Sequence, residues 1–225
     1  MEAFIQKIQV IVPEKLYLRD PMTSELGQKI ISESIRIIDL YGLEKFTFKK
    51  LAEQLHTAEA SIYRYFENKQ RLLLYLISWY WVWKEYRLVF SIANIESPEK
   101  KLEKAIETLL EAPSIHTGYA FLDINALERI IILESSKSYL TKEVDIVNQD
   151  GLYSSYKSYC QRIATIFHEI NPNYPYTHAL AATVLEGLLH QQFFADHLPS
   201  LSDFKNNRDG IQTFIIGLCK KTLSK

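Results

Sequence analysis

The chain has 225 residues, of which 47% are hydrophobic and 24% are charged, and its formal net charge is −1. This composition is that of a folded globular protein of one or two domains, and it excludes a long disordered tract. No apolar run is long enough to span a bilayer and no stretch has the features of a signal peptide, so we expect no membrane association and a cytoplasmic location.

Glycine and proline are scarce, with seven of each, and most stand where helical patterns end. No run of any length alternates with period two, so we predict an all-α chain of about nine helices. Cys160 and Cys219 lack the spacing of a metal or redox site, and we expect both to be small buried hydrophobic residues in a reducing compartment.

Residues 1–22 have no helical period and contain Pro13 and Pro21, so we predict an N-terminal arm there. A loosely packed arm is one interpretation, because chain termini are commonly mobile. The alternative is an arm that reaches along a nucleic acid through Lys7, Lys15 and Arg19. The first long helix is predicted to begin within 21–24, after the Asp20-Pro21 cap, and to end at Gly42.

The next stretch, residues 46–69, predicts two short helices joined by a tight turn. Thr47 is placed to cap a first helix from Phe48 to about Leu55, whose apolar residues recur at helical spacing. His56-Thr57 breaks that pattern, and a second helix follows from about Ala58 to Phe66. Helix, short turn and helix is the geometry that lays the second helix in the major groove of DNA.

The polar residues of this stretch support nucleic-acid recognition. Between Lys45 and Arg71, six basic residues stand against three acidic ones, although the whole chain is slightly acidic. Small side chains allow close approach to base edges, while tyrosine, lysine and arginine reach phosphates or bases. A solvated lysine pair is the plain alternative for two of them. The predicted DNA-facing residues are Thr47, Lys49, Lys50, Ala60, Ser61, Tyr63, Arg64, Tyr65 and Lys69.

These residues also carry a resemblance to a known family. The stretch resembles the DNA-binding domain of the TetR family of bacterial transcriptional regulators through Gly42, Phe46-Thr47, Leu51-Ala52, Ser61-Ile62-Tyr63, Tyr65-Phe66, Asn68-Lys69 and Leu72-Leu73. The resemblance implies a homodimer that binds a double-stranded operator with an inverted repeat and releases it when a small-molecule effector binds. It also implies that Thr47, Tyr63 and Lys69 hold phosphates. The sequence departs from the family at His56, where glycine is usual.

Residues 23–70 are therefore the predicted helix-turn-helix domain, and 71–225 the predicted ligand-binding and dimerisation domain. Asn68 is placed to cap the next helix, which follows it and runs to about Ile95. This helix is predicted to begin under the helix-turn-helix and to carry an apolar face, with Tyr80 and Trp81 outside it. Further helices are predicted at about 98–112, 119–136, 141–170 and 175–197, and from 202 or 203 to 223, with a loop at 114–118.

The chain has 14 Tyr, 11 Phe and 3 Trp, and many of them fall between Trp79 and Tyr159. Tyrosine joins an apolar body to one hydroxyl, which suits a mostly apolar ligand with few polar groups, although aromatic residues on a helix face commonly form core instead. The predicted pocket residues are Trp79, Trp83, Tyr86, His116, Phe121, Asn125, Tyr156 and Tyr159.

The last two predicted helices contain glycine and alanine at positions where larger side chains would keep a neighbouring helix away. Such small residues indicate close helix approach, either between subunits or within one chain. The predicted dimer contacts are Ala182, Gly187, Gly210, Phe214 and Gly217. No catalytic constellation, cofactor loop or metal motif stands out, so we expect no enzyme, cofactor or metal. The alternative function is a helical ligand- or protein-binding module of the same fold that has lost DNA binding, an idea that Glu59 in the second helix keeps open.

Overall fold

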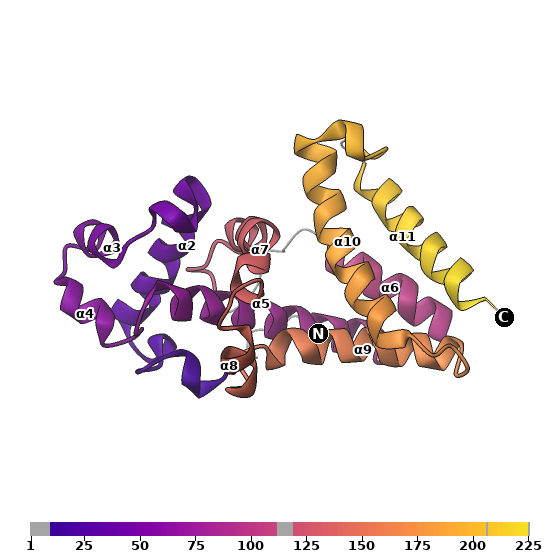
Figure 1. The fold of residues 1–225 in the computed structure, drawn as a ribbon, viewed down its shortest axis with the longest axis horizontal. Coiled ribbons are helices and arrows are strands. Elements are labelled where there is room, and N and C mark those ends of the chain that lie inside the picture. Colours follow the sequence, from indigo (N-terminus) through magenta and orange to yellow (C-terminus); the bar gives the residue numbers. More distant parts are fainter. Residues whose placement is uncertain (1–9, 112–118, 206, 225) are drawn as a thin grey trace. The chain divides into compact units, whose positions relative to one another are not determined.

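The computed structural model describes residues 10–111, 119–205 and 207–224. Every regular element in these ranges is helical, which confirms the all-α prediction (Figure 1). Ten α-helices, labelled α2 to α11, are present in the described residues, against the nine expected. The predicted loop at 114–118 lies outside the described residues.

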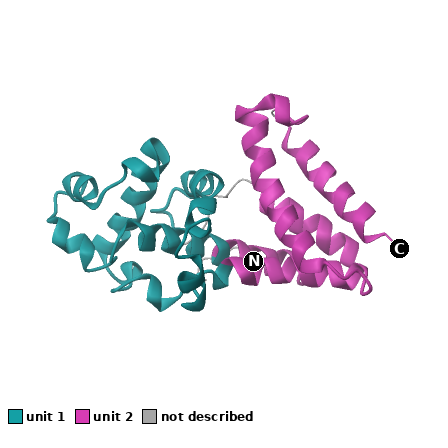
Figure 2. Cartoon of the chain, viewed as in Figure 1, with its two compact units in different colours: residues 1–82, 112–155 teal, residues 83–111, 156–225 magenta. Residues whose placement is uncertain are grey.

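The chain forms two compact units (Figure 2). Unit 1 consists of residues 1–82 and 112–155, and unit 2 of residues 83–111 and 156–225. The boundaries at 22 and 70 predicted above concern functional segments and remain predictions. Helix α5 contributes residues to both units.

Unit 1 holds the helices that the N-terminal pattern predicted, together with a later pair. They are α2 (Glu25–Lys45), α3 (Phe48–Gln54), α4 (Glu59–Tyr63), the first part of α5 (Lys69–Ile92), α7 (Ile124–Tyr139) and α8 (Val144–Gln149), with the short 3₁₀ turns η1 (Glu14–Leu16) and η2 (Pro21–Thr23). Helix α7 packs along α2, so two segments about ninety residues apart share one core.

The described part of the N-terminal arm is packed against unit 1, which corrects the expectation of a loose arm. Val10, Val12 and Leu16 are buried. The Val10 N–H donates to the Tyr119 hydroxyl at 2.9 Å, and Lys15 Nζ forms an ion pair with Asp150 at 2.9 Å. These apolar side chains pack against unit 1 without any helical period, which is why the periodicity of the sequence did not predict the contact.

Helix α2 begins and ends at residues whose chemistry explains its limits. The Ser24 side chain accepts from the Gly27 N–H at 3.2 Å, while Asp20 caps the separate turn η2, so the helix starts slightly later than predicted. A Cβ on Gly27 would lie 2.2 Å from the Pro21 carbonyl oxygen, so this close crossing of η2 over α2 requires glycine. Gly42 has φ +78° and interrupts the helix there, in agreement with the predicted end.

Helix α5 is buried on all sides between residues 72 and 81. Trp81 and Tyr80, expected outside its apolar face, are as buried as Trp79. A helix that is apolar all round lies inside the protein, so its aromatic side chains serve in the core on every side. The amphipathic interpretation of this helix was therefore wrong.

Unit 2 contains the rest of α5, α6 (Pro98–Leu110), most of α9 (Ser154–Ile170), α10 (Thr177–His197), the turn η3 (Pro199–Leu201) and α11 (Arg208–Leu223). Helix α11 packs against α6 and α10. Apolar residues of all these helices form the core, among them Leu102, Ile106, Ile163, Phe167, Leu185 and Ile211.

Three predicted helix boundaries were wrong, each because a cap or a turn was overlooked. The helix predicted over 141–170 is two helices, α8 and α9, separated by a turn in which Gly151 has φ +76°. Helix α7 starts after Asp123, whose carboxylate accepts from the Ala126 N–H, and not at Tyr119. Helix α11 starts after Asn207, whose side-chain oxygen accepts from the Gly210 N–H, and not at 202 or 203.

Candidate nucleic-acid interface

The first helix of the predicted helix-turn-helix, α3, is capped at its start by Thr47. The Thr47 hydroxyl accepts from the Lys50 N–H at 3.2 Å, which satisfies one of the backbone donors left free at a helix start. Phe48 and Leu51 are buried, whereas Lys49 and Lys50 are exposed. Lys50 Nζ donates to the Lys45 carbonyl oxygen at 2.8 Å, so one of the two lysines also braces the chain before the helix.

The turn between α3 and α4 is made without glycine. His56 has φ +51°, and it is the one non-glycine residue with positive φ among the residues that the structure describes. The Thr57 N–H donates to the Ala52 carbonyl oxygen at 3.0 Å and closes the turn. Histidine therefore adopts the left-handed conformation that glycine adopts with less strain.

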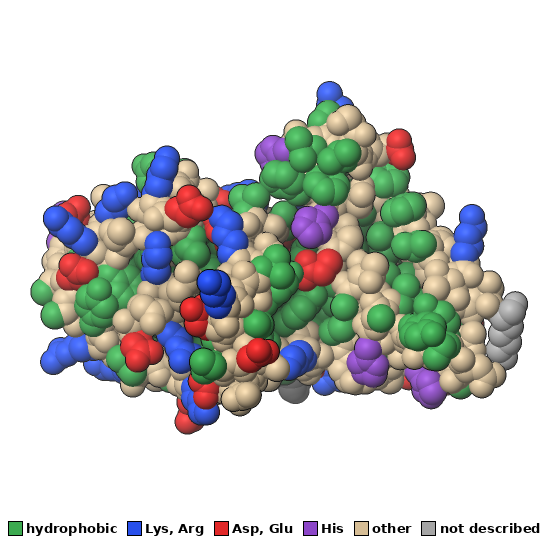
Figure 3. All heavy atoms as spheres, in the orientation of Figure 1, with side chains coloured by type: hydrophobic (Ala, Val, Ile, Leu, Met, Phe, Trp, Pro, Cys, Tyr) green, Lys and Arg blue, Asp and Glu red, His purple; other side chains and the backbone are tan. Residues whose placement is uncertain are grey.

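Helix α4 is short, but it exposes most of the predicted residues together. Ile62 is fully buried, whereas Ala60, Tyr63 and Arg64 are exposed and Ser61 is half-buried. The Tyr63 ring meets Phe48 edge-on at 5.0 Å, and this contact fixes the direction of the tyrosine. Lys and Arg side chains surround the α3–α4 part of unit 1 on the face shown in Figure 3.

Tyr65 does not belong to this exposed set. It is 2% exposed, its hydroxyl lies 2.8 Å from Ser24 Oγ, and its carbonyl oxygen accepts from the Leu18 N–H. Arg19 lies over its ring. Because α4 ends at Tyr63, the helical period no longer sets the direction of residue 65, and the tyrosine joins the core between the arm and α2. Its assignment to the DNA face is corrected accordingly.

Lys69 has a structural role that the sequence did not reveal. Its Nζ donates to the carbonyl oxygens of Leu43, Glu44 and Phe46, at 3.1, 3.4 and 3.5 Å. These carbonyls lie where α2 ends and the chain turns into α3. Lys69 therefore links the first turn of α5 to that segment. The expected phosphate contact of Lys69 stays a prediction.

The segment that contains α3 and α4 is similar to a known protein family. Residues 30–76 match the family model described as bacterial regulatory proteins, tetR family. The match spans most of α2, the two helices α3 and α4, and the first turns of α5. No curated protein matches the chain in sequence.

Solved structures extend the similarity beyond the tetR-family domain. AibR in complex with isovaleryl coenzyme A and operator DNA is similar with a TM-score of 0.60 at 15% identity, covering 85% of this chain and 97% of that one. A transcriptional regulator from Saccharomonospora viridis in complex with choline gives 0.58 at 17%, covering 88% and 97%. The ketosteroid transcriptional regulator KstR2 of Mycobacterium tuberculosis gives 0.54 at 13%, covering 89% and 93%. Most of the chain therefore has the fold of these proteins.

The residues predicted to line a ligand pocket divide between the two units of the chain. Trp79, Phe121 and Asn125 lie in unit 1, where the rings of Trp79 and Phe121 both contact Tyr119 and Asn125 is exposed. Trp83, Tyr86, Tyr156 and Tyr159 lie in unit 2. His116 lies outside the described residues. The pocket they were expected to form stays a prediction.

Burial sets the chemistry of the unit 2 members. Tyr159 is fully buried, and burial raises the pKa of its hydroxyl. The Tyr156 hydroxyl donates to Glu186 at 2.8 Å. The Trp83 ring lies beneath two cations, with Arg87 at 5.1 Å and Lys84 at 5.5 Å from its centroid.

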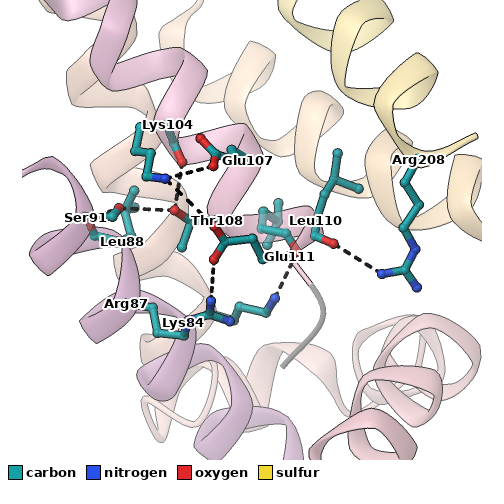
Figure 4. A network of polar contacts seen from close by, with 11 residues as sticks. Lys84, Arg87, Leu88, Ser91, Lys104, Glu107, Thr108, Leu110, Glu111 and Arg208 are labelled. Atoms are coloured by element: carbon teal, nitrogen blue, oxygen red, sulfur yellow. Dashed lines mark hydrogen bonds and ion pairs between the residues drawn. The ribbon is translucent and has the colours of Figure 1, made fainter. Parts of the chain in front are cut away.

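These cations belong to a polar network that the sequence did not reveal (Figure 4). Lys84 is fully buried, and its Nζ donates to the Leu109 carbonyl oxygen at 2.9 Å. Arg87 pairs with Glu111, and Lys104 pairs with Glu107 and more distantly with Glu111. A lysine within the aromatic run of α5 was the available signal, since a charge inside an apolar helix needs polar partners.

The predicted dimer contacts on α10 and α11 have different surroundings. A Cβ on Gly210 would lie 2.7 Å from the Asn207 side chain, so a close contact within the same chain explains glycine at this position. Gly187 and Gly217 have open space beside them, and Phe214 is 47% exposed. Ala182 is partly exposed.

The remaining points concern metal binding, membrane spans and the two cysteines in the described residues. They contain no group of three His, Cys, Asp or Glu side chains placed to hold a metal ion. None of their helices has the length and apolar character needed to cross a membrane. Cys219 is buried, which raises the pKa of its thiol to about 12, whereas Cys160 is only half-buried.

Proposed function

We propose that this chain is a dimeric, DNA-binding transcriptional repressor that a small, mostly apolar effector releases from an inverted-repeat operator. The observation that carries the proposal is the tetR-family helix-turn-helix, whose short α4 presents Ala60, Tyr63 and Arg64 on one exposed side. On this proposal the protein is not an enzyme and works in the cytoplasm.

The DNA contact rests on the exposed polar side of α3 and α4. Arg64 and Tyr63 are free to reach base edges or phosphates, and Lys49 and Lys50 stand at the start of α3. Phosphate contacts dominate affinity and base contacts set specificity, so a half-site needs both groups. Because the local excess of positive charge is modest, we expect tight binding to require two subunits.

The effector site is proposed within the helical domain that follows. Support comes from the aromatic residues of α5 and α9 and from the solved structures of the same fold that hold isovaleryl coenzyme A or choline. Those two ligands differ in charge and size, so they support a small-molecule effector without naming it. Lys84 and Arg87 lie beside Trp83, and they supply positive charge for a polar end of the effector.

The subunit contact is proposed on α10 and α11. Gly187 and Gly217 leave open space where a neighbouring helix is able to approach closely, and Phe214 offers an exposed apolar side chain between Gly210 and Gly217. Paired helices from two copies form a four-helix bundle.

The first experiment selects binding sites for the purified chain from random double-stranded DNA. We expect an inverted repeat whose affinity falls steeply as salt rises, because each phosphate contact releases counterions. Arg64→Ala is expected to weaken binding at least about fivefold, on the ~1–3 kcal/mol that a base contact contributes. Arg162→Ala, a surface arginine of unit 2, is the matched control and should bind as the parent does.

An absence of any enriched sequence at low salt, with both variants behaving alike, contradicts the proposal. The same fold would then serve as a binding module without DNA, and screening would turn to the ligand alone.

A further inference from the structure

The arm that precedes α2 passes the end of α4 before it enters η2. The Leu18 N–H donates to the Tyr65 carbonyl oxygen at 2.8 Å, and the Asp20 carboxylate accepts from the Met22 N–H at 2.8 Å. Arg19 lies between these two attachments, so its backbone is held on both sides. The structure therefore fixes Arg19 beside the residues that directly follow α4.

The Arg19 side chain lies over a buried aromatic ring. Its guanidinium carbon is 5.4 Å from the centroid of the Tyr65 ring, and Arg19 is exposed whereas Tyr65 is 2% exposed. An aromatic face attracts a guanidinium through its quadrupole and carries no formal charge of its own. Tyr65 thus holds a cation at the surface next to the end of α4 without neutralising it.

Arg19 differs from the other cations that an arm along a nucleic acid was expected to use. Lys15 is paired with Asp150 at 2.9 Å, and Lys7 lies outside the described residues. Arg19 forms no ion pair within the described part of the chain, and its acidic neighbour Asp20 serves as the cap of η2. An exposed guanidinium on a fixed support is well suited to a phosphate group, because its planar donors match the phosphate oxygens.

The length of α4 places this cation near the phosphates when α4 occupies the major groove. The five residues of α4 rise ~7 Å along the helix axis, whereas the major groove of B-DNA is ~12 Å wide. The base-reading start of so short a helix is close to its end. A segment attached to that end therefore lies against the edge of the groove, where the phosphate groups are.

We propose that Arg19 binds a phosphate group of the DNA backbone beside the groove that α4 enters, and that Tyr65 is the positioning residue that holds it there. This contact rests on the proposed function, because it requires α4 to enter the major groove. It gives the buried Tyr65 an indirect part in DNA binding through its ring. A phosphate contact carries no sequence information, so it adds affinity for any duplex.

The experiment measures Kd of the full chain by fluorescence anisotropy over a salt series, for the selected operator and for an unrelated duplex. Arg19→Ala is expected to weaken both complexes by similar factors. It should also reduce the magnitude of the salt slope by about 1.8, since each lost phosphate contact accounts for about 0.9 and both subunits lose one. Arg64→Ala should instead weaken the operator complex more than the unrelated one, because base contacts set specificity. An Arg19→Ala chain with the Kd and the salt slope of the parent overturns the proposal.

Lys15→Ala is the matched control, since it removes the same charge from the same arm at a residue that is already paired with Asp150. It should keep the salt slope of the parent. An equal loss in both variants would assign the effect to the net charge of the arm, and this outcome also overturns the contact of Arg19. Arg19→Lys is expected to retain most of the slope, because an ammonium group binds phosphate as a point charge.

The supporting role of Tyr65 is tested through its effect on Arg19. Tyr65→Phe keeps the ring, so Arg19→Ala should weaken DNA binding as much in that background as in the parent. Tyr65→Met keeps an apolar side chain without a ring, and Arg19→Ala should then weaken binding less than it does in the parent. Denaturant unfolding checks that each chain is folded. An Arg19→Ala effect of full size in the folded Tyr65→Met chain overturns the positioning role of Tyr65.

DNA binding by the parent chain separates a wrong residue from a wrong function. If the parent binds its selected operator and Arg19→Ala changes nothing, only the Arg19 contact is removed and the proposed function stands. If the parent enriches no sequence and binds no duplex at low salt, the proposed function is contradicted, and the contact with it.

Discussion

At the scale of single residues, the two tyrosines at the end of α4, Tyr63 and Tyr65, have opposite surroundings. Tyr63 is exposed and its ring rests on Phe48, whereas Tyr65 is buried with its hydroxyl 2.8 Å from Ser24 Oγ. Both are aromatic, both follow the small residues of α4, and the sequence assigned both to the DNA face. The end of α4 between them decides which one reaches solvent.

A pair of hydroxyl deletions tests this difference. Tyr65→Phe is expected to lower the free energy of unfolding by about 1 kcal/mol, because a buried hydrogen bond is lost, and to leave operator affinity unchanged. Tyr63→Phe is expected to change stability by less than ~0.5 kcal/mol and to weaken operator binding several-fold. Denaturant unfolding and fluorescence anisotropy on the selected operator measure the two effects. The assignment is wrong if the two variants exchange these effects.

At the scale of secondary-structure elements, the turn from α2 into α3 is held from two sides. The Leu43 N–H donates to Glu134 of α7 at 3.3 Å, and Lys69 binds the carbonyls that follow. Arg129 of α7 also pairs with Asp39 of α2 through two bonds, at 2.8 and 2.7 Å. Helix α7 thus contacts the turn that precedes α3, and on the proposed function it is a second element, beside α5, through which an effector acts on the DNA-facing helices.

Removing the Glu134 carboxylate of α7, which accepts from this turn, should destabilise the turn. Glu134→Ala leaves the buried Leu43 N–H without its acceptor, so we expect a loss of about 1–3 kcal/mol in the free energy of unfolding. Glu143→Ala, an exposed glutamate at the start of α8 whose side chain makes no capping bond, is the control and should change stability little. Thermal and denaturant unfolding of both variants provide the comparison. Equal stability of the two variants would remove Glu134 from this role.

At the scale of the whole molecule, the proposed function depends on two copies acting together. Each copy presents only a modest positive surface to its half of the operator, so on this proposal the free energy of operator binding comes from both subunits. The proposed contact lies on α10 and α11, where Phe214 is exposed and Gly187 and Gly217 have open space. Exposed hydrophobic side chains next to such glycines are typical of helix-on-helix contacts between subunits.

A charge placed on this face is expected to separate the subunits. Phe214→Glu should reduce the mass in sedimentation equilibrium from two chains to one, and it should weaken binding to the full operator far more than to a half-site. Leu140→Glu introduces the same charge at a leucine of unit 1 that is 77% exposed, and it should leave the dimer intact. A Phe214→Glu chain that keeps the mass of a dimer would exclude this face as the subunit contact.

The sequence by itself determined the elements that local chemistry fixes. The Thr47 cap, the apolar spacing of Phe48 and Leu51, the break at Gly42 and the Asn68 cap all lie within a few residues of the structure they specify, and each is present as predicted. They were sufficient to predict an all-α chain with a helix-turn-helix near its N-terminal end, because short-range hydrogen bonds and one apolar face define that motif.

Only the tertiary structure decided the features that depend on residues far apart in the chain. Lys69 meets carbonyls 23 to 26 residues away, Glu134 meets Leu43 across 91 residues, and the arm reaches Tyr119 across 109. Trp81 and Tyr80 became core because α5 is covered on every side, and Lys84 became part of a buried polar network because the end of α6 supplies the Leu109 carbonyl oxygen. No local period records such encounters, since they arise from how packed helices bring distant side chains together.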